Sequence, residues 1–524
     1  MEPTKEQQAI LKAKGRVVRI NARAGTGKTT TLRMLANEHA DKKILYLVFN
    51  RKASEEAQAK FPENVTVRTV HSLAWRYLGR EYENIGDFSP KDFLPYFRRV
   101  ENPQVISKIT YDFLVYFLNS SADRIEDALG SFEVLLPEQA KGLYKRHLPK
   151  VIESARNLAT LWNRREKPCP HDFYLKMFHK LGKFDQVLGR YDLVLVDEGQ
   201  DLSGVMLDAL RKCQRRIIVV GDTHQQIYRF RYAIDAMQNL PADENYDLTL
   251  SFRFGKPVAN IASLLIREAK GDERFTILGN PRKDSGLAVM DSFPRRDCAI
   301  LSRTNLSLFA NAVALGSKRA NFRFERDIEK VLWQTLDIFW LMSGERSKVR
   351  NEWLQSFENM EALEKYADDC DDFQIKGVSQ VVRRYGYSFP ELIYEMADIN
   401  KNKAGGGKSG GVILSTVHAS KGQEYDRVFV DSDIADMLGA EEKMDAAQYD
   451  EEVNIAYVGI TRAIRQLFIP KAFERVLSTK WQEFVKSCKQ EPGKRESMPG
   501  AAPKTGKKKK RKPARRRFGE NFEY

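Results

Sequence analysis

The chain has 524 residues, enough for more than one domain with its own hydrophobic core. Hydrophobic residues make up 42% and charged residues 30%, which is typical of a soluble globular protein. No apolar run approaches the roughly 18 residues of a membrane span, and the N-terminus lacks the apolar stretch of a secretory signal. We therefore expect an intracellular protein with no membrane partner.

The cysteine pattern and the charge distribution narrow the class further. Five cysteines are scattered without a CxxC pair: Cys169, Cys213, Cys298, Cys370 and Cys488. We interpret them as reduced thiols, not as disulfides, zinc ligands or iron–sulfur ligands. The net charge is +15, of which Gly493–Tyr524 carries nine, because that segment has twelve Lys or Arg and three Glu. The body is mildly basic, which favours a polyanionic partner but is a weak indication alone.

Two sets of short β-branched runs alternate with helical stretches, a pattern typical of parallel sheets covered by helices. The first set is Arg16–Ile20, Ile44–Phe49, Tyr191–Val196 and Arg216–Val220. The second set is Cys298–Ser302, Val412–Thr416, Arg427–Asp431 and Gln466–Ile469. The pattern predicts an α/β fold built from two parallel-sheet modules.

Stretches with helical spacing and no strand pattern interrupt both modules. We predict the first module at residues 1–77 and 191–244, with a helical insertion at 78–190. The second module is predicted at 245–345 and 410–488, with a small helical insertion at 346–409 that ends in a glycine-rich hinge. Residues 489–524 are rich in Lys, Arg, Pro and Gly, which predicts a disordered basic tail.

A phosphate-binding loop follows the first predicted strand and precedes a helix. Gly25 and Gly27 let the backbone amides turn toward an anion, and the helix N-terminus adds its positive dipole. Lys28 is expected near the outer phosphates, and the Thr29 hydroxyl is a candidate ligand of Mg²⁺. The loop starts with Ala22 in place of the usual Gly. The predicted phosphate-binding residues are Ala24, Gly25, Thr26, Gly27, Lys28, Thr29 and Thr30.

An acidic pair follows the predicted strand Tyr191–Val196. Carboxylates at the C-terminal end of such a strand lie beside the phosphate loop in this class of sheet. We predict that Asp197 holds Mg²⁺ through water and that Glu198 polarises the attacking water. The sequence thus predicts ATP as the substrate and Mg²⁺ as the cofactor.

An ordered series of motifs, from residue 4 to about 470, resembles the UvrD/Rep type of superfamily 1 DNA helicases. GTGKTTTL, LYLVFNRKASEEAQAKFP, TVHSLA and LSFRFG are most similar to the F-box DNA helicase branch. The resemblance implies two RecA-like P-loop modules with ATP in the cleft between them. Because Gln7 lies almost at the start, we expect no F-box segment before the motor and no ubiquitin-ligase role.

The resemblance also implies roles at the ATP cleft. Gln7 would read adenine, Phe252 would stack on it, and Glu424 would approach the ribose. Gln225 would contact the γ-phosphate, while arginine fingers would come from the second module. The implied catalytic residues are Lys28, Asp197, Glu198, Gln225, Arg253 and Arg462.

The same resemblance implies a path for a nucleic-acid single strand across both modules. Phe49 and Phe230 are candidates for stacking on bases, which needs no particular sequence. Core packing is the alternative for both rings, and we favour it for Trp75 and Tyr228. The implied strand contacts are Phe49, Asn50, Thr69, His71, Phe230, Arg231, Arg303, Thr416 and His418.

Three residues and one segment depart from the family pattern. Gly199 replaces the Ala of DEAQD, and Gln423 replaces a Leu. Tyr232 replaces the Gly of RGA, which puts the close backbone approach there in question. The segment available for a mobile fourth subdomain is also short, about 60 residues.

We expect an ATP-driven DNA helicase or translocase that acts in recombination or repair, with single-stranded DNA and single/double-strand junctions as partners. The resemblance implies 3′ to 5′ movement. Two alternatives share every motif: a translocase that strips proteins without unwinding, and an RNA helicase of the same superfamily. A catalytically dead nucleic-acid scaffold is disfavoured, because the catalytic set is intact.

The basic tail has three interpretations. Lys507–Arg517 fits a nuclear import signal, an electrostatic nucleic-acid arm or a solvated tail, and the first two are compatible. A eukaryotic source would place the protein in the nucleus, and any other source in the cytoplasm or nucleoid. Phe518–Tyr524 has three aromatic residues and is a candidate docking peptide for a protein partner.

Overall fold

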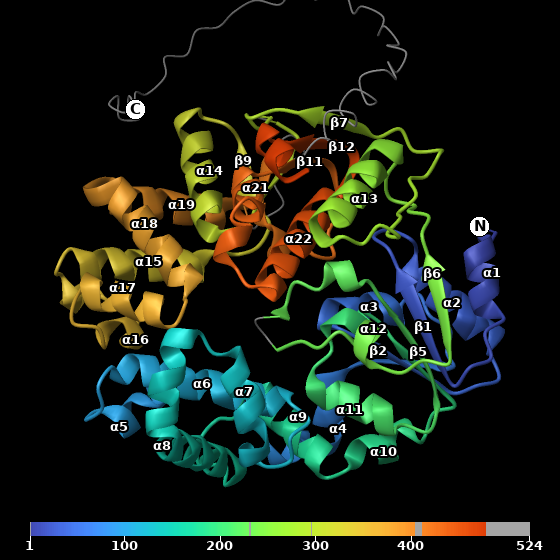
Figure 1. The fold of residues 1–524 in the computed structure, drawn as a ribbon, viewed down its shortest axis with the longest axis horizontal. Coiled ribbons are helices and arrows are strands. Elements are labelled where there is room, and N and C mark those ends of the chain that lie inside the picture. The colour runs from blue at the N-terminus through green and yellow to red at the C-terminus, as the bar shows by residue number, and fades with distance from the viewer. Residues whose placement is uncertain (1, 230–231, 295, 404–410, 478–524) are drawn as a thin grey trace, which may run out of the picture.

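Two parallel sheets form the centres of two modules (Figure 1). The computed structural model describes residues 2–229, 232–294, 296–403 and 411–477. The first sheet contains β1 (Val17–Ala22), β2 (Ile44–Val48), β3 (Val65–Thr69), β4 (Leu193–Val196), β5 (Arg216–Gly221) and β6 (Glu244–Leu248). The second contains β7 (Gly286–Val289), β8 (Ala299–Ser302), β9 (Phe322–Phe324), β10 (Val412–Thr416), β11 (Tyr425–Val430) and β12 (Ala463–Ile469). The predicted α/β fold with two parallel-sheet modules is therefore confirmed.

Every strand that the sequence pattern predicted is an interior strand of its sheet. The first sheet has the order β3-β2-β4-β5-β1-β6, and the second has β7-β12-β11-β8-β10-β9. All neighbouring strands run parallel. The four strands that the sequence pattern missed, β3, β6, β7 and β9, are the four edge strands. Because β6 pairs with β1, the chain leaves the first sheet only after Leu248.

Helices cover both faces of the first sheet and form the insertion that follows β3. The helices of the module are α1 (Lys5–Leu11), α2 (Lys28–Glu38), α3 (Arg51–Gln58), α4 (Val70–Leu78), α11 (Gly204–Lys212) and α12 (Ala236–Asn239). The insertion contains α5 (Leu94–Phe97), α6 (Pro103–Asn119), α7 (Leu129–Leu135), α8 (Glu138–Asn163), α9 (His171–Lys180) and α10 (Lys183–Leu188). Apolar residues of α6 at helical spacing, such as Ile106, Ile109 and Phe113, are buried in its core.

The second module carries its own helices and a second helical run. The module contains α13 (Lys256–Lys270), α14 (Asn305–Ser317), α20 (Val417–Ser420), α21 (Ser432–Leu438) and α22 (Ala446–Ile460). The helical run contains α15 (Glu329–Met342), α16 (Glu352–Gln355), α17 (Met360–Asp369), α18 (Phe373–Tyr385) and α19 (Phe389–Lys403). We group α15 with this run because it packs on α18 and α19.

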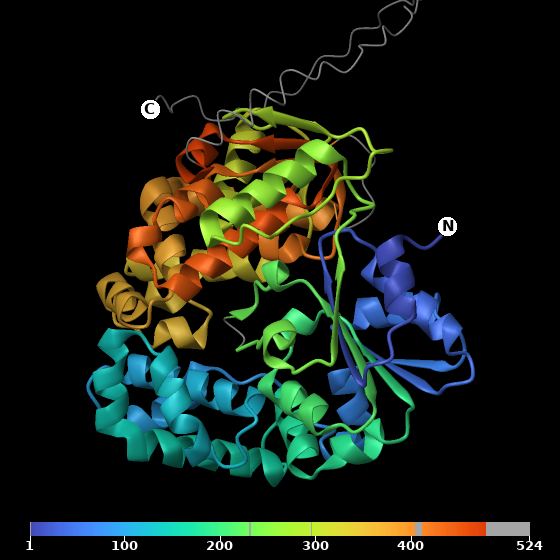
Figure 2. The ribbon, with the colours of Figure 1, turned by 45° about the vertical axis from the view of Figure 1, so that its right-hand side comes forward.

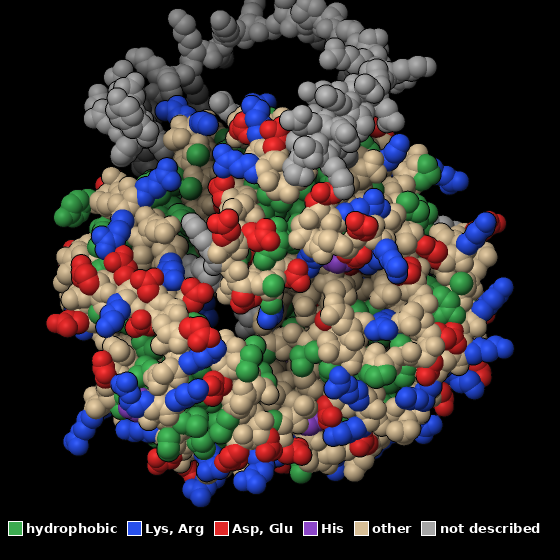
Figure 3. All heavy atoms as spheres, in the orientation of Figure 1, with side chains coloured by type: hydrophobic (Ala, Val, Ile, Leu, Met, Phe, Trp, Pro, Cys, Tyr) green, Lys and Arg blue, Asp and Glu red, His purple; other side chains and the backbone are tan. Residues whose placement is uncertain are grey.

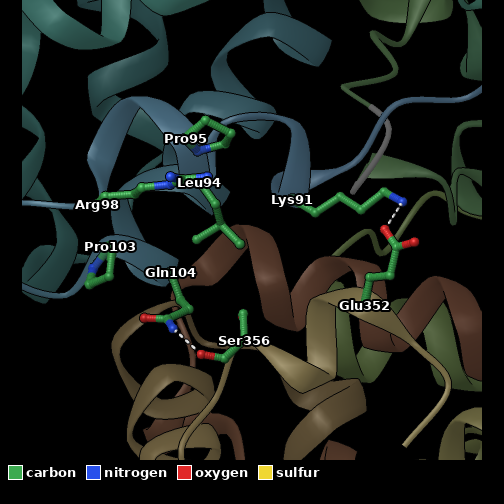
Figure 4. Close-up of a pocket in the computed structure, with 8 residues that line it drawn as sticks. All are labelled: Lys91, Leu94, Pro95, Arg98, Pro103, Gln104, Glu352 and Ser356. Atoms are coloured by element: carbon green, nitrogen blue, oxygen red, sulfur yellow. Dashed lines mark hydrogen bonds and ion pairs between the residues drawn. The ribbon is translucent and has the colours of Figure 1, made fainter.

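The two helical insertions lie side by side, although they belong to different modules (Figures 1 and 2). The Nζ of Lys91 lies 2.6 Å from a carboxylate oxygen of Glu352, and the side-chain amide of Gln104 donates to the Ser356 carbonyl at 2.7 Å (Figure 4). In a space-filling view, acidic and basic side chains alternate over this face, which is hollowed near the centre of the view (Figure 3). The modules and insertions thus surround a central hollow.

The modules also share apolar core across their boundary. The core of the second module includes Val258, Ile261 and Val458, and it takes in two residues of the first module, Ala24 and Ile227. Loops of the first module, including the phosphate loop that contains Ala24, therefore pack directly on the core of the second module.

The cysteines and the helices of the described residues bear on two expectations from composition. Cys169, Cys213, Cys298 and Cys370 are free thiols, whereas Cys488 lies outside the described residues. Within those residues, no helix combines the length and the apolar character that crossing a membrane would require. The predicted glycine hinge and basic tail fall almost entirely outside the described residues.

Candidate active site between the two modules

The phosphate loop joins β1 to α2 and has the backbone geometry that its glycines allow. Gly25 and Gly27 have φ angles of +72° and +81°, in the left-handed region that favours glycine. The Thr26 hydroxyl donates to the Arg23 carbonyl at 2.8 Å and closes the loop. Since α2 begins at Lys28, its first turn, Lys28, Thr29 and Thr30, offers free backbone amides to an anion.

An ion pair joins this loop to the end of β4. The Nζ of Lys28 lies 2.9 Å and 3.0 Å from the two carboxylate oxygens of Glu198. Burial opposes both charges, but their mutual attraction outweighs it: the pKa of Lys28 is raised, and Lys28 with Lys421 lowers the pKa of Glu198 to about 2. Glu198 is therefore ionised at neutral pH.

The neighbouring carboxylate suits a hard cation. Asp197 accepts a hydrogen bond of 2.7 Å from the hydroxyl of Tyr46. Burial and the charge of Glu198 raise the pKa of Asp197. Mg²⁺ prefers oxygen ligands and usually takes one or two carboxylates together with substrate phosphates. The hydroxyl of Thr29 and the carboxylate of Asp197 fit that donor set.

Two further residues, missed in the sequence analysis, connect these carboxylates to Gln225. The side-chain amide of Gln200 donates to Glu198 at 2.6 Å, and its carbonyl accepts the backbone N–H of Asp222 at 3.0 Å. The amide of Gln225 donates to the Asp222 carboxylate at 2.7 Å. Gln200 and Asp222 lie in the same motifs as the predicted residues, but no spacing rule indicated that their side chains meet.

The second module contributes two arginines and a glutamate to the cleft. Arg253 donates to the Thr461 carbonyl at 2.7 Å and pairs with the Glu424 carboxylate at 2.7 Å. Arg462 is fully buried, and burial together with Arg253 lowers its pKa to about 9. A Cβ on Gly25 would lie 2.7 Å from the Cβ of Arg253. The phosphate loop therefore touches the segment that carries the predicted arginine finger.

The predicted adenine-binding residues also lie together. Gln7 is buried in α1, and its side-chain amide donates to the Thr31 hydroxyl at 3.0 Å. A Cβ on Gly27 would lie 3.5 Å from the Phe252 ring and 3.7 Å from the amide nitrogen of Gln7. Both side chains thus flank the same end of the phosphate loop.

A lysine of the second module reaches into the acidic cluster of the first. The ammonium of Lys421 pairs with the Asp201 carboxylate, and it donates to the Gln225 carbonyl at 2.7 Å. Burial raises the pKa of Asp201 to about 6, although Lys421 acts in the opposite direction. Lys421 was not among the predicted site residues, although it lies between His418 and Glu424, which were.

Of the predicted strand contacts, the structure brings Phe49 and His418 together through Tyr228. The rings of Phe49 and Tyr228 stack, with centroids 5.6 Å apart and planes 10° apart, and Phe49 is 41% exposed. The Tyr228 hydroxyl donates to the His418 carbonyl at 3.4 Å. Phe49 is therefore partly exposed and lies across the module boundary from His418, while Tyr228 links the two.

The remaining predicted strand contacts have other local partners. Asn50, Thr69 and Thr416 cap the N-termini of α3, α4 and α20 with their side chains. His71 lies 2.9 Å from the Asp172 carboxylate of the insertion and is 43% exposed. The Arg303 guanidinium forms a two-point ion pair with Glu452 inside the second module. Phe230 and Arg231 lie outside the described residues.

Trp75 does not fit the expectation of core packing. It is 38% exposed, and its ring contacts Tyr174 of the insertion edge-on, with centroids 5.3 Å apart. The reason is its place on α4, at the boundary between the first module and the insertion.

Two regions of the chain match domains of a known protein family. Residues 3–244 match the UvrD/REP helicase N-terminal domain, and residues 309–473 match the UvrD-like helicase C-terminal domain. The chain belongs to the UvrD/Rep family of helicases. The resemblance inferred from the motifs is therefore confirmed. The first matched region contains β1 to β5, and the second contains β9 to β12.

Individual relatives in the family cover different shares of the chain. F-box DNA helicase 1 of Gallus gallus is 28% identical over 96% of this chain and 51% of its own length. F-box DNA helicase protein 1 of Schizosaccharomyces pombe is 28% identical over 89% of this chain and 57% of its own length. ATP-dependent DNA helicase PcrA of Bacillus subtilis is 33% identical over 16% of this chain and 12% of its own. The chain spans about half the length of the two F-box relatives.

Proposed function

We propose that this chain is an ATP-dependent DNA helicase that moves 3′ to 5′ on single-stranded DNA in recombination or repair. One observation carries the proposal: catalytic candidates of both modules converge on one phosphate loop. Lys28 and Glu198 come from the first module, and Arg253, which touches Gly25, comes from the second. The relatives named above are all DNA helicases, which supports DNA as the nucleic acid along which this protein moves.

Hydrolysis follows from the residues around the loop. Lys28 and the first turn of α2 bind the phosphates, while Gln7 and Phe252 hold the base. Glu198, ionised at neutral pH, accepts a proton from the water that attacks the γ-phosphorus. Thr29 and Asp197 would hold Mg²⁺, and a bound Mg²⁺ would neutralise charge on the phosphates.

The second module supplies charge to the transition state. Arg253 and Arg462 stabilise the negative charge on the transferring phosphoryl group, an effect of roughly 10³ to 10⁵ in rate in related chemistry. Because these arginines and the phosphate loop belong to different modules, bound ATP draws the modules together and hydrolysis releases them. Phe49 in the first module and His418 in the second contact the single strand. Repeated closing and opening of the modules therefore moves the protein along that strand.

Two related functions use the same residues. A translocase that strips proteins without separating strands is favoured by the short fourth subdomain. An RNA helicase would use the same cleft, but none of the proposed contacts reads a 2′-hydroxyl. ATP turnover measured with single-stranded DNA, duplex DNA and single-stranded RNA tests the proposal. We expect strong stimulation by single-stranded DNA; turnover that only RNA stimulates would overturn the assignment to DNA.

The basic tail and the cell compartment belong to the same proposal. We propose that Lys507–Arg517 binds nucleic acid beside the motor and, in a eukaryotic cell, also directs the protein to the nucleus. Single/double-strand junctions are the proposed substrates, and Phe518–Tyr524 is the proposed docking peptide for a protein partner.

A further inference from the structure

The phosphate loop carries an arginine whose side chain packs against the second module. The guanidinium carbon of Arg23 lies 4.3 Å from the centroid of the Phe275 ring, within the range of a cation–π contact. Phe275 follows α13 and is completely buried. The nucleotide-binding loop of one module is thus stacked on the core of the other.

Phe275 and Tyr457 together form a socket, here called the aromatic socket, at this boundary. Their rings meet edge-on, with centroids 5.7 Å apart and planes 86° apart. His224 of the first module enters the same socket, with its ring 4.6 Å from Phe275 and nearly perpendicular to it. Arg23 and His224 are therefore two side chains of the first module inserted into one aromatic site of the second.

The socket also reaches the catalytic residues through a hydroxyl group. The backbone N–H of Ala24 donates to the Tyr457 hydroxyl at 3.3 Å, and that hydroxyl donates to the Asp222 carboxylate at 3.1 Å. Tyr457 therefore holds the residue next to Arg23 and, at the same time, the carboxylate that binds Gln225.

The position of Tyr457 connects the socket to an arginine finger. Tyr457 belongs to the last turn of α22, which ends at Ile460, and Arg462 follows two residues later. The Nε of Arg462 donates back to the Val458 carbonyl at 3.0 Å, which ties its guanidinium to that turn. A change in how the phosphate loop sits in the socket would therefore move the end of α22 and Arg462 with it.

We infer that Arg23 is a positioning residue of the ATPase: by stacking on Phe275 it fixes the second module, and with it Arg462, against the phosphate loop. The inference rests on the proposed ATP hydrolysis. The buried Nε of Arg23 has no hydrogen-bond partner among the described residues, whereas its guanidinium carbon lies over the Phe275 ring. A nucleotide ligand role for Arg23 is the competing interpretation, and it makes a different kinetic prediction.

The test is a set of variants of the full chain: Arg23→Met, Arg23→Lys and Phe275→Leu, with the double variant Arg23→Met/Phe275→Leu. We measure kcat and KM for ATP with saturating single-stranded DNA, and the Kd of a fluorescent non-hydrolysable ATP analogue. A residue that acts only when the transition state forms lowers kcat and leaves ground-state binding unchanged. We expect Arg23→Met to lower kcat about tenfold, with KM and Kd within about twofold of wild type.

The other variants separate positioning from simple loss of structure. Arg23→Lys keeps a cation over the ring and should recover part of kcat. The double variant should be no slower than the worse single variant, because both changes remove one contact. Arg427→Met is the matched control: Arg427 lies 5.2 Å from the Phe468 ring within the second module alone, and its loss should leave kcat unchanged.

Distinct results would overturn the inference or the function on which it rests. A raised Kd for the analogue with unchanged kcat would make Arg23 a nucleotide ligand. Unchanged kinetics of Arg23→Met, or additive losses in the double variant, would also overturn the positioning role. If instead Lys28→Ala kept full turnover, or the wild-type chain had none, the proposed ATPase itself would fail and this inference with it.

Discussion

The Nζ of Lys28 lies 2.9 Å from the carboxylate of Glu198, and this pair joins the two motifs that the sequence separates by 170 positions. Each group keeps the other ionised, although burial disfavours both charges. The positive charge of Lys28, together with that of Lys421, lowers the pKa of Glu198 to about 2. A phosphate bound to the loop would compete with Glu198 for the ammonium. Release of the carboxylate from Lys28 would then leave it available to accept a proton from water.

The first prediction removes either member of this pair. Lys28→Ala and Glu198→Gln should each lower ATP turnover by about a hundredfold or more, since phosphate binding or proton transfer is lost. Circular dichroism and strand affinity should remain close to wild type, because neither side chain belongs to an apolar core. Near wild-type turnover in either variant, measured by phosphate release, would refute the catalytic assignment.

The second prediction concerns the arginines of the second module. Arg253→Ala and Arg462→Ala should reduce kcat by up to about a thousandfold while changing nucleotide affinity far less, because the charge they neutralise develops in the transition state. Because Arg462 is buried, its removal could destabilise the fold. The melting temperature of the Arg462→Ala variant must therefore be measured, beside that of a milder Arg462→Lys variant. Weak analogue binding combined with normal turnover would instead identify these arginines as binding residues.

The sequence predicted the interior strands of both sheets and missed the edges. Every residue of β2 and β4 is buried, which requires the continuous apolar runs that the pattern analysis recognises. The edge strands β6 (ENYDL) and β7 (GLAV) have a neighbour on one side only and remain half-exposed. Their sequences therefore lack the run of buried side chains on which the prediction depended.

In the candidate site, too, the sequence predicted some residues and missed others. Motif residues such as Lys28 and Glu198 were predictable because local spacing defines their place on a loop or at a strand end. The pair between Lys421 and Asp201, and the stack of Arg23 on Phe275, depend on how two modules meet. No local pattern encodes such a contact, so these partners could be found only in the three-dimensional structure.

The third prediction concerns the basic tail, which lies outside the described residues. Deleting Gly493–Tyr524 removes nine net positive charges and none of the motifs. Turnover at saturating DNA should survive, whereas DNA affinity should fall. The slope of log affinity against log salt should become shallower by about 0.7 for each lost phosphate contact.

A reporter fused to the tail separates its two proposed roles. Nuclear accumulation in a eukaryotic cell would support import, and a shallower salt slope would support the nucleic-acid arm. An unchanged slope together with a diffuse reporter would leave a solvated tail with neither role.

The fourth prediction uses the histidine of the aromatic socket. Burial, with Lys270 and Arg23 nearby, lowers the pKa of His224 to about 3, against Asp272, which acts in the opposite direction. The unfolded chain, with an ordinary histidine pKa near 6.5, therefore binds the proton first as the pH falls. His224 thus contributes stability that is present above pH 6.5 and is lost as the pH falls from 6.5 toward 3.

His224→Phe keeps a ring in the socket and removes the titration. Between pH 7.5 and pH 5, wild type should lose about 2 kcal/mol more free energy of unfolding than the variant. Urea unfolding at the two pH values measures the difference. Parallel losses in both proteins would show that His224 is protonated in the folded state or that its burial does not control its titration.

Strand displacement tests the central claim, a DNA motor driven by the cleft between the modules, most directly. Three duplexes, with a 3′ overhang, a 5′ overhang or none, are mixed with the chain and ATP, and Lys28→Ala serves as the matched control. The account predicts ATP-dependent strand separation of the 3′-overhang duplex alone and none with Lys28→Ala. Vigorous ATP turnover on single-stranded DNA without separation of any duplex would contradict unwinding, and separation of only the 5′-overhang duplex would contradict the proposed direction.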